Sequence, residues 1–523
     1  KAALDSTFSS IRNGIQIYGQ KADTMIRFSV SITAILLVNF WPDSGKALYA
    51  AASGVSNAKA AYTLSTFEIP EPLKLEVSGL APLPDGRLAI AIRKGEIWIA
   101  DQTRHPESTL YTPFAKGLHE PLGLAFHEDA LYTVQRTELT RIRDLDHDGI
   151  ADEYWTIAKG WGVTGNYHEY AYGPQFDLEG HAWITLNIGI GRGSIPDDNA
   201  WRGWSIKISP DGSWSPVSAG FRSPSGIGMN TAGDIFATDQ QGNWFPTCPL
   251  IHVKPGSFHG HADALEHTRR PESSLQWSNE IPSGMSVVEA AKHLQAYQLP
   301  AIWFPYRKMG MSATDVLWNT TKGKFGPFDD QAIVGEFTMS MLLRVYLEEI
   351  DGIYQGACFR FFEGLQCGVL RLAWDNEGDL IVGESNRGWN SLGNRSYGME
   401  KLTWTGEMPF EMQRINALHD GFRISFTQPL SKNTSITPNH VKIQSYTYHY
   451  HASYGSDEIL KSNLEITDIV LAHDRTSLDV RVKGLREGFV HEIELEGFKS
   501  NEEKKLMHTI AAYTLNKIPK QTD

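Results

Sequence analysis

The chain has 523 residues, a formal net charge of −13 and no block of basic residues. This balance argues against nucleic acid as a partner, because nucleic-acid binding needs clustered Lys and Arg. Aromatic residues make up 11% of the chain and include 15 Trp. Together with many Gly and few long helical patterns, they indicate an all-β protein that binds a sugar or another flat ligand. The length is sufficient for two domains.

Residues 1–61 are expected to be an upstream segment followed by a secretory signal, with Met25 as its start. Arg27 supplies a positive charge, residues 28–41 are mostly apolar, and small residues follow as Ala at 50–52 and as Ala-Lys-Ala at 58–60. The apolar stretch is shorter than the roughly 20 residues that span a bilayer. We therefore expect a periplasmic or extracellular protein with no stable membrane span after cleavage. A buried helix or a membrane anchor is the alternative.

A hairpin pattern recurs along the chain: a short apolar strand, a turn that usually carries an acidic residue or Gly, and an alternating strand. The six copies are residues 79–91, 122–133, 172–185, 225–238, 313–334 and 369–382. Their spacing leaves room for four strands each, which predicts a six-bladed β-propeller over residues 62–407. Residues 408–523 contain further alternating strands. They predict a small immunoglobulin-like β-sandwich.

In a propeller, the start of each first strand and the end of each second strand share one rim. Polar groups that converge there suit an active or binding site, although a solvated rim that binds nothing is the alternative. These positions are occupied by Arg93, Lys94, His119, Glu120, Gln135, Arg136, His168, Glu169, Asn187, Arg222, Ser223, Asp239, Gln240, Gln241, Lys308, Ser312, Glu336, Gln366, Cys367, Glu384, Asn386 and Arg387.

Residues 144–153 read DLDHDGIADE, with Asp144, Asp146, Asp148 and Asp152 around Gly149. Alternating carboxylates let side chains wrap one ion, and Gly permits the sharp turn, so this segment predicts a structural Ca²⁺ loop. It is no EF-hand, because the twelfth position is a Trp rather than a Glu. An acidic solvated turn is the alternative.

The Cys and His residues allow two further interpretations. Cys358 and Cys367 could pair in an oxidising compartment and leave Cys248 free. A C-x3-H-x6-H-x-H pattern could hold Zn²⁺ or Cu, but its spacing matches no strong motif, and an ordinary loop is favoured. The pattern consists of Cys248, His252, His259 and His261.

Several motifs together resemble the secreted glucose/sorbosone dehydrogenase-like proteins, and among them a large bacterial propeller branch. The motifs are RIRDLDHDGIADEYW, NYHEYAYGPQFD, GFRSPSGIG, DQQGNWFPTC, FHGHA, YQGACF, ESNRGW and SYTYHYHASYGS. The resemblance covers nearly all of residues 62–517. It implies a six-bladed quinoprotein that binds pyrroloquinoline quinone (PQQ) over the central channel and oxidises a hydroxyl or aldehyde group of a sugar.

The resemblance also implies roles for rim residues. His168 is similar to the family's catalytic base, and Arg222 to the arginine that pairs with the carboxylates of the cofactor. Three family positions differ here: Ser223 replaces an Asn, Thr338 replaces a Lys, and Arg371 is out of step with an expected arginine pair. Arg387 is the nearest substitute for that pair. The other candidates for cofactor binding are Asn187, Asp239 and Gln241.

Two functions follow from these observations. The first is a secreted sugar dehydrogenase that uses a quinone. The second is a carbohydrate-active hydrolase or lyase, or a glycan-binding propeller, without quinone. In that second case His168, Glu169 and Glu384 would be the acid/base groups.

Overall fold

The computed structural model describes residues 60–190, 200–277, 280–294, 296–433 and 436–521. The predicted signal segment with its start at Met25 lies outside them, apart from residues 60 and 61. Within the described part of the chain, no helix has the length and apolar character needed to cross a bilayer.

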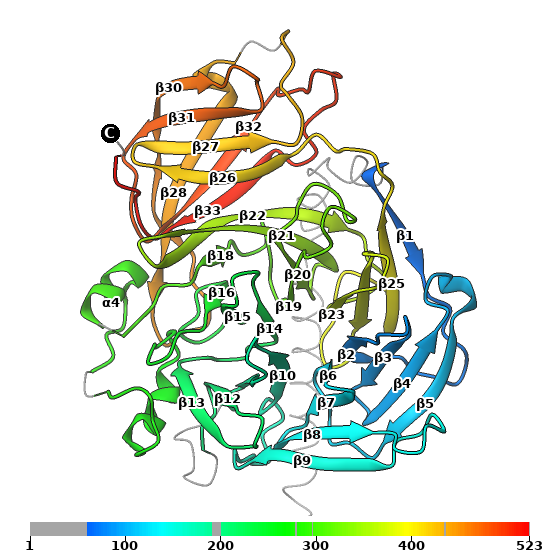
Figure 1. The fold of residues 1–523 in the computed structure, drawn as a ribbon. Helices are drawn as coiled ribbons and strands as arrows, with labels where there is room; N and C mark the ends of the chain where they lie inside the picture. Colours follow the sequence, from blue (N-terminus) through cyan, green and yellow to red (C-terminus); the bar gives the residue numbers. More distant parts are fainter. Residues whose placement is uncertain (1–59, 191–199, 278–279, 295, 434–435, 522–523) are drawn as a thin grey trace, which may run out of the picture. The chain divides into compact units, whose positions relative to one another are not determined.

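Six sets of four antiparallel strands form the blades of a propeller (Figure 1). Five of them are separate four-stranded sheets, and blade five is part of a larger sheet. Blade one consists of β2 (Val77–Pro82), β3 (Leu88–Ile92), β4 (Glu96–Asp101) and β5 (Leu110–Lys116). Blade two consists of β6 (Leu124–His127), β7 (Ala130–Val134), β8 (Glu138–Arg143) and β9 (Glu153–Lys159). Blade three consists of β10 (Ala171–Phe176), β11 (Ala182–Leu186), β12 (Trp204–Ile208) and β13 (Trp214–Ala219).

Blade four consists of β14 (Gly226–Met229), β15 (Ile235–Thr238), β16 (Cys248–His252) and β18 (Ile302–Phe304). Blade five consists of β19 (Ala313–Trp318), β20 (Ala332–Glu336), β21 (Met341–Ile350) and β22 (Ile353–Glu363). Blade six consists of β23 (Val369–Trp374), β24 (Leu380–Ser385), β25 (Tyr397–Trp404) and β1 (Tyr62–Thr66). The pairing of β1 with β25 joins the two ends of the ring within one sheet.

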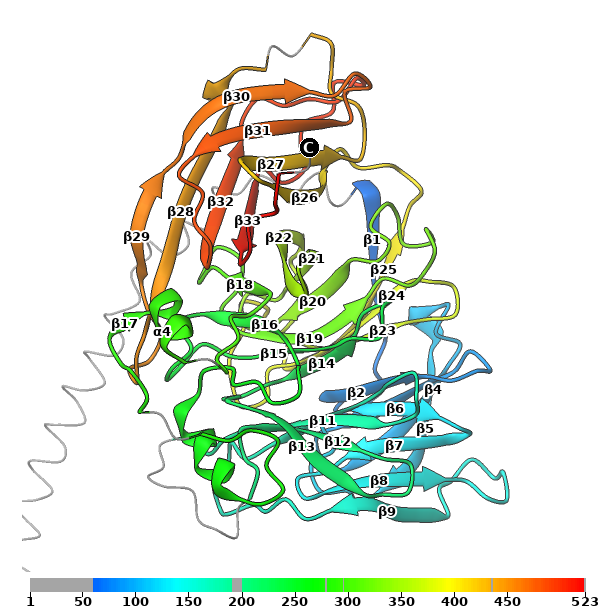
Figure 2. The ribbon, with the colours of Figure 1, turned by 60° about the vertical axis from the view of Figure 1, so that its left-hand side comes forward.

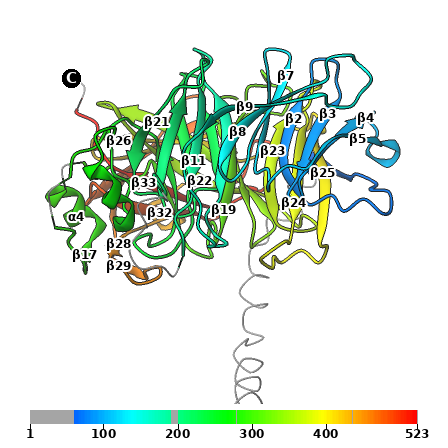
Figure 3. The same ribbon diagram turned by 90° about the horizontal axis from the view of Figure 1, so that it is seen from below.

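The inner strands contact one another in a closed circle, in the order β2, β6, β10, β14, β19 and β23, and β23 again contacts β2 (Figure 1). Figure 3 shows the strands of the blades from the side. Each blade buries both faces against its neighbours, so its second strand is buried throughout, as in LAIAI of β3. The predicted all-β, six-bladed fold is confirmed.

Arg371 fills the centre of the ring. Its guanidinium donates to three backbone carbonyls of other blades: Ser78 at 2.9 Å, Ser225 at 3.1 Å and Leu122 at 3.3 Å. It also lies 5.1 Å from the centroid of the Tyr172 ring. This explains why Arg371 is out of step with a rim arginine: its side chain points into the channel and joins blades one, two, three and four to blade six.

The C-terminal strands form two sheets that share an apolar core. The first sheet consists of β26 (Met412–Leu418), β27 (Gly421–Phe426), β31 (Ser477–Lys483) and β30 (Glu465–Leu471). The second consists of β28 (Val441–Tyr450), β29 (Glu458–Asn463), β32 (Phe489–Leu495) and β33 (Ile510–Leu515). Because β33 pairs with β22, this second sheet continues into blade five. A separate immunoglobulin-like sandwich and the domain boundary at residue 408 stay predictions.

Helical structure in the described residues is short. Helix α4 (Val287–His293) lies between blade-four strands and begins with a capping box formed by Ser286 and Glu289. Strand β17 (Met285–Ser286) precedes it and pairs with β28. The 3₁₀ turns are η1 (Pro106–Ser108), η2 (Ala262–Arg269) and η3 (Pro438–His440).

The cysteines are all free and buried, so the bridge considered between Cys358 and Cys367 is wrong for this structure. The two side chains have different partners. The Cys358 thiol lies in β22 and donates to the Ala512 carbonyl at 3.5 Å, whereas the Cys367 thiol donates to Glu384 at 3.8 Å.

Candidate functional site

At the blade-four rim, Asp239 fixes the backbone that carries Arg222. Its carboxylate accepts the backbone N–H of Arg222 and that of Ser223, each at 2.7 Å. Asp239 follows β15 and Arg222 precedes β14, so this contact closes the open end of the blade-four hairpin. Burial raises the pKa of Asp239 to about 6, and the backbone donors oppose that rise. Asp239 therefore positions Arg222 through its backbone.

Blade five repeats the device with Glu336, the last residue of β20. Its carboxylate accepts the backbone N–H groups of Met311, at 2.8 Å, and of Ser312 and Met339. Burial raises the pKa of Glu336 to about 7. Asp239 and Glu336, at the ends of second strands, thus have a structural role: their carboxylates accept from backbone N–H groups that have no partner within the sheet.

The guanidinium of Arg222 is buried without a direct ion pair, although its charge acts on the buried Asp239 carboxylate and lowers the pKa of that group. The residue is 6% exposed, and no ion pair or side-chain hydrogen bond joins it to any described residue. It packs on the backbone of Gly242, where a Cβ atom would collide with the guanidinium. The ring centroid of Tyr454 lies 5.5 Å from the guanidinium carbon. A buried charge is costly unless it is paired, so this position favours an anionic ligand.

His168 lies at the same end of the ring, before β10 of the neighbouring blade. Its backbone N–H donates to Asn166 Oδ1 at 3.0 Å, which fixes the turn that presents the imidazole. Partial burial lowers the pKa of His168, and the charges of Arg222, Arg136 and Arg93 lower it further. The imidazole is therefore neutral at neutral pH and able to accept a proton. The predicted placement of His168 and Arg222 at one end of the channel agrees with the structure.

A charged and aromatic network borders His168 on the side of blades one and two. Glu120 accepts from Arg93 at 3.2 Å and also from Arg136. Arg93 donates to the Tyr167 hydroxyl at 2.7 Å and to that of Tyr170. The Glu120 carboxylate therefore accepts hydrogen bonds from two arginines, and these three groups leave a net positive charge at the rim beside His168.

The opposite blade approaches this network. A Cβ atom on Gly388, which follows β24 of blade six, would lie 3.0 Å from the Tyr167 hydroxyl and 3.6 Å from Arg93. Blades three and six are opposite each other in the ring. The loop after β24 of blade six therefore lies close to the loop before β10 of blade three. The candidate site lies to one side of this contact, at blades three and four.

The two carboxylates proposed for acid/base chemistry are both buried. Glu169 is 0% exposed, and its oxygens accept from the Thr164 backbone N–H and hydroxyl. Glu384 is also 0% exposed, and burial followed by the charge of Glu400 raises its pKa well above the ordinary value. Glu169 directly follows the turn that carries His168, and Glu384 lies in β24, which is buried along its whole length.

The remaining predicted binding residues differ in availability. Arg387 is paired with Glu76 at 2.7 Å, and the amide nitrogen of Gln241 donates to the Pro246 carbonyl at 2.9 Å. Asn187 is 2% exposed, and its side-chain oxygen has no hydrogen-bond partner within the described structure. Of these three, only Asn187 has a buried side-chain polar atom without a hydrogen-bond partner among the described residues.

These groups permit a test of the expected quinone cofactor, which carries carboxylates. Arg222 offers a buried cation for a carboxylate, and the unsatisfied amide oxygen of Asn187 is an acceptor for an N–H or O–H group of the ligand. The residues of blades three and four therefore fit a carboxylate-bearing ring. Arg387 of blade six is less suited to bind a carboxylate of the cofactor, because it already forms an ion pair with Glu76.

Tyr454 is a site residue that the sequence pattern did not single out. It belongs to SYTYHYHASYG, for which an aromatic ligand surface or packing against the propeller are the alternatives. Tyr446, Tyr448 and Tyr450 are at most 1% exposed and pack in the core, whereas Tyr454 is 65% exposed beside Arg222. Alternation along β28 buries the first three, and the chain leaves the strand before the fourth.

The acidic loop brings three of its four predicted ligands together. Oxygen atoms of Asp144, Asp146 and Asp152 lie within 4.8 Å of one another, whereas Asp148 is outside this group. Asp148 instead accepts the backbone N–H of Ile150 at 2.8 Å. Calcium binding stays a prediction, now with three carboxylates.

The Cys248 and His pattern forms no metal-binding group among the described residues. His259 and His261 lie behind Arg222, and their backbone N–H groups donate to the carbonyls of Ala219 and Gly220. Burial lowers the pKa of each imidazole to about 3, so both are neutral.

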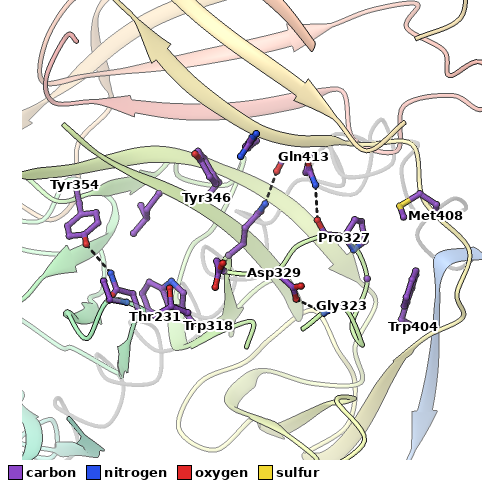
Figure 4. A pocket seen from close by; sticks show the side chains of 17 residues that line it. Thr231, Trp318, Gly323, Pro327, Asp329, Tyr346, Tyr354, Trp404, Met408 and Gln413 are labelled. Atoms are coloured by element: carbon purple, nitrogen blue, oxygen red, sulfur yellow. Dashed lines mark hydrogen bonds between the residues drawn. The ribbon is translucent and has the colours of Figure 1, made fainter. Parts of the chain in front are cut away.

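A groove of about 840 Å³ lies at the other end of the blades (Figure 4). It is lined by turn residues of blades four and five, by β21 and β22, and by the start of β26. Its polar groups bond to one another: Asn230 donates to the Tyr354 hydroxyl at 3.1 Å, and Gln413 donates to the Pro327 carbonyl at 3.1 Å. None of the titratable rim residues described above lines this groove.

A family model described as a domain of unknown function, DUF7133, matches residues 98–295. No curated protein sequence matches the chain. Among solved structures, the chain is similar to a putative oxidoreductase (glucose dehydrogenase) of Thermus thermophilus. The identity is 18% and the TM-score 0.48, over 65% of this chain and 99% of the other.

Two further structures are similar. The PQQ-bound aldose sugar dehydrogenase of Streptomyces coelicolor has 16% identity and a TM-score of 0.46, over 66% of this chain and 98% of its own. The soluble aldose sugar dehydrogenase of Escherichia coli, in its apo form, has 14% identity and a TM-score of 0.46, over 65% and 99%. The chain thus has sugar dehydrogenases of this soluble type among its structural neighbours, at low identity and over about two thirds of its length.

Proposed function

We propose that this protein is a sugar dehydrogenase-like oxidoreductase whose site lies at the rim of blades three and four. Arg222 binds a carboxylate of a quinone cofactor, and His168 is the base that removes a proton from the sugar hydroxyl. The observation that carries the proposal is the buried Arg222 guanidinium, which forms no direct ion pair and whose charge lowers the pKa of the His168 imidazole.

The charge of Arg222 has two effects at this site. It attracts a carboxylate, for which a planar guanidinium is well suited. It also lowers the pKa of His168, which keeps an imidazole nitrogen free to accept a proton at neutral pH. A bound quinone would supply the two-electron acceptor that none of the 20 amino-acid side chains provides. Asp239 holds the Arg222 backbone and thereby positions the cation.

The alternative of glycan hydrolysis requires two carboxyl groups that flank the sugar. The two candidates, Glu169 and Glu384, are each 0% exposed. At the described rim, Glu120 already accepts from two arginines. The geometry therefore favours a cation and a neutral base over a carboxylate pair.

We also propose that the protein works in the periplasm or outside the cell. The support is the sequence after Arg27, which has the order of charge, apolar stretch and small residues of a secretory signal.

The test is to add PQQ and Ca²⁺ to the purified protein and record the absorbance of the bound quinone and dye reduction with a panel of sugars. We expect sugar-dependent dye reduction in the wild type. In His168→Ala, turnover should fall by roughly 100-fold while quinone binding is retained. Arg222→Ala should lose quinone binding, and Arg395→Ala, at an exposed arginine, should behave as wild type. A wild-type protein that binds no quinone, or a fully active His168→Ala variant, would contradict the proposal.

A further inference from the structure

The connection between β28 and β29 lies against the rim of blade four. We call residues 451–457 of this connection the rim loop. Figure 2 shows β28 and β29 as long neighbouring strands that run from the C-terminal sheets toward α4 and β17. The rim loop therefore brings part of the C-terminal region to the propeller at blade four, where Arg222 lies.

Backbone hydrogen bonds hold the rim loop at both ends. At its start, the Trp244 N–H donates to the His451 carbonyl at 3.0 Å. At its end, the Gly455 N–H donates to the Gly242 carbonyl at 3.0 Å, and the Ser456 N–H donates to the Pro246 carbonyl at 3.0 Å. The loop is thus anchored to the same backbone, Gly242, on which the Arg222 guanidinium packs.

Asn243 strengthens this anchoring in the middle of the loop. Its side-chain amide donates to the Ala452 carbonyl at 2.6 Å, and its backbone pairs with Tyr454 in an isolated antiparallel bridge. The backbone of Tyr454 therefore has a fixed position, and its ring extends from that position toward the site.

The ring of Tyr454 is 65% exposed although its backbone is anchored. Its centroid lies 5.5 Å from the Arg222 guanidinium carbon. An exposed aromatic ring has an apolar face that favours contact with another ring, and Tyr loses little conformational entropy when it makes that contact. The adjoining cation favours a carboxylate. The two side chains together have the features that recognise a ring with a carboxylate attached.

We propose that Tyr454 is a ligand-stacking residue of the Arg222 site, so that the C-terminal strands complete a binding site of the propeller. The ligand is a ring that bears a carboxylate: the carboxylate pairs with Arg222, and the ring stacks on Tyr454. This deepens the proposed function and rests on its assignment of Arg222. A quinone carboxylate and an acidic sugar share this chemistry, and binding measurements distinguish them.

The experiment measures binding by calorimetry for three probes: PQQ, a glucuronate-containing disaccharide, and acetate as a carboxylate without a ring. We compare wild type, Tyr454→Ala, Tyr454→Phe, Arg222→Ala and Trp155→Ala. Trp155 is the matched control, because it is a 58% exposed aromatic residue on the outer strand of blade two. Circular dichroism and Tm check that each variant is folded.

We expect Tyr454→Ala to weaken binding of the ring-bearing probe by about 3- to 10-fold, the usual size of an aromatic contact. Tyr454→Phe should remain within about 2-fold, because it keeps the ring. Acetate binding should depend on Arg222 and not on Tyr454, and Trp155→Ala should match wild type. Equal affinity of Tyr454→Ala and wild type for every ring-bearing probe would overturn the inference.

The outcomes separate this inference from the proposed function. If the disaccharide binds in a Tyr454-dependent way and PQQ does not bind, the stacking role stands and the quinone-dependent activity fails. If PQQ supports turnover and Tyr454→Ala binds it normally, the activity stands and the stacking role fails. If wild type binds none of the probes, both are wrong.

Discussion

Arg371 of blade six and Tyr172 of blade three meet at the centre of the ring, with the guanidinium carbon 5.1 Å from the ring centroid. The two residues belong to opposite blades, 199 positions apart in the chain (371 − 172). The same guanidinium donates to carbonyls of blades one, two and four. The buried side chain of Arg371 thus connects blade six to blades one, two, three and four.

Arg371→Met should therefore lower the stability of the propeller. It removes the donor for the carbonyls of Ser78, Leu122 and Ser225, which remain buried in the channel, at a cost of at least about 2 kcal/mol. Thermal unfolding followed by circular dichroism measures the change in Tm. Arg395→Met, at an exposed position, is the control; an equal Tm for the two variants would show that the central contacts contribute nothing.

The pH dependence of turnover should report on His168. Burial and three arginine charges lower its pKa below the ordinary value of 6.5, so the neutral base persists as the pH falls through 6.5. We expect the acidic limb of kcat/KM to lie below pH 6.5. NMR titration of His168 should show the same midpoint, and Arg222→Ala should move it upward because one positive charge is lost. A His168 midpoint unaffected by Arg222→Ala would contradict the assigned interaction.

Glu336 makes a separate prediction about stability. Burial raises its folded-state pKa from 4.5 to about 7, so its protonated form is favoured in the folded protein. Its contribution is fully present below pH 4.5 and is lost as the pH rises through 7. Glu336→Gln removes this titration. The Tm deficit of Glu336→Gln relative to wild type should therefore be larger at about pH 5 than at about pH 8. A constant deficit would mean that Glu336 is ionised throughout.

The acidic loop should respond to removal of calcium. If Ca²⁺ binds Asp144, Asp146 and Asp152, EDTA lowers the Tm of the wild type and added Ca²⁺ restores it, because a ligand of the folded state stabilises it. Asp144→Asn should abolish this response. Asp148→Asn should retain it, since Asp148 lies outside the group of three. An unchanged Tm on chelation would exclude a structural ion.

The cysteines can be counted chemically. All three are free and buried. Without reductant, a thiol reagent should titrate three groups in denaturant and react far more slowly with the native protein. One reactive thiol in denaturant would instead show that Cys358 and Cys367 had paired.

The sequence by itself determined the features that local patterns encode. Each hairpin has its own strand period and turn, so six blades could be counted from 79–91 to 369–382. Because the inner strands of a propeller all begin at one rim, the positions of His168 and Arg222 before β10 and β14 also predicted that they lie at the same end. These conclusions need only the order of strands.

Tertiary structure alone decided which rim groups face the site. Glu169 is the next residue after His168, yet it is buried, because it follows the turn at His168 and its carboxylate accepts from the Thr164 backbone N–H and hydroxyl. Arg371 turns into the channel, and Arg387 is paired with Glu76. The approach of Tyr454 to Arg222 depends on β33 pairing with β22 and on the anchoring of the rim loop. Such contacts join residues far apart in the chain, and no local period in the sequence encodes them.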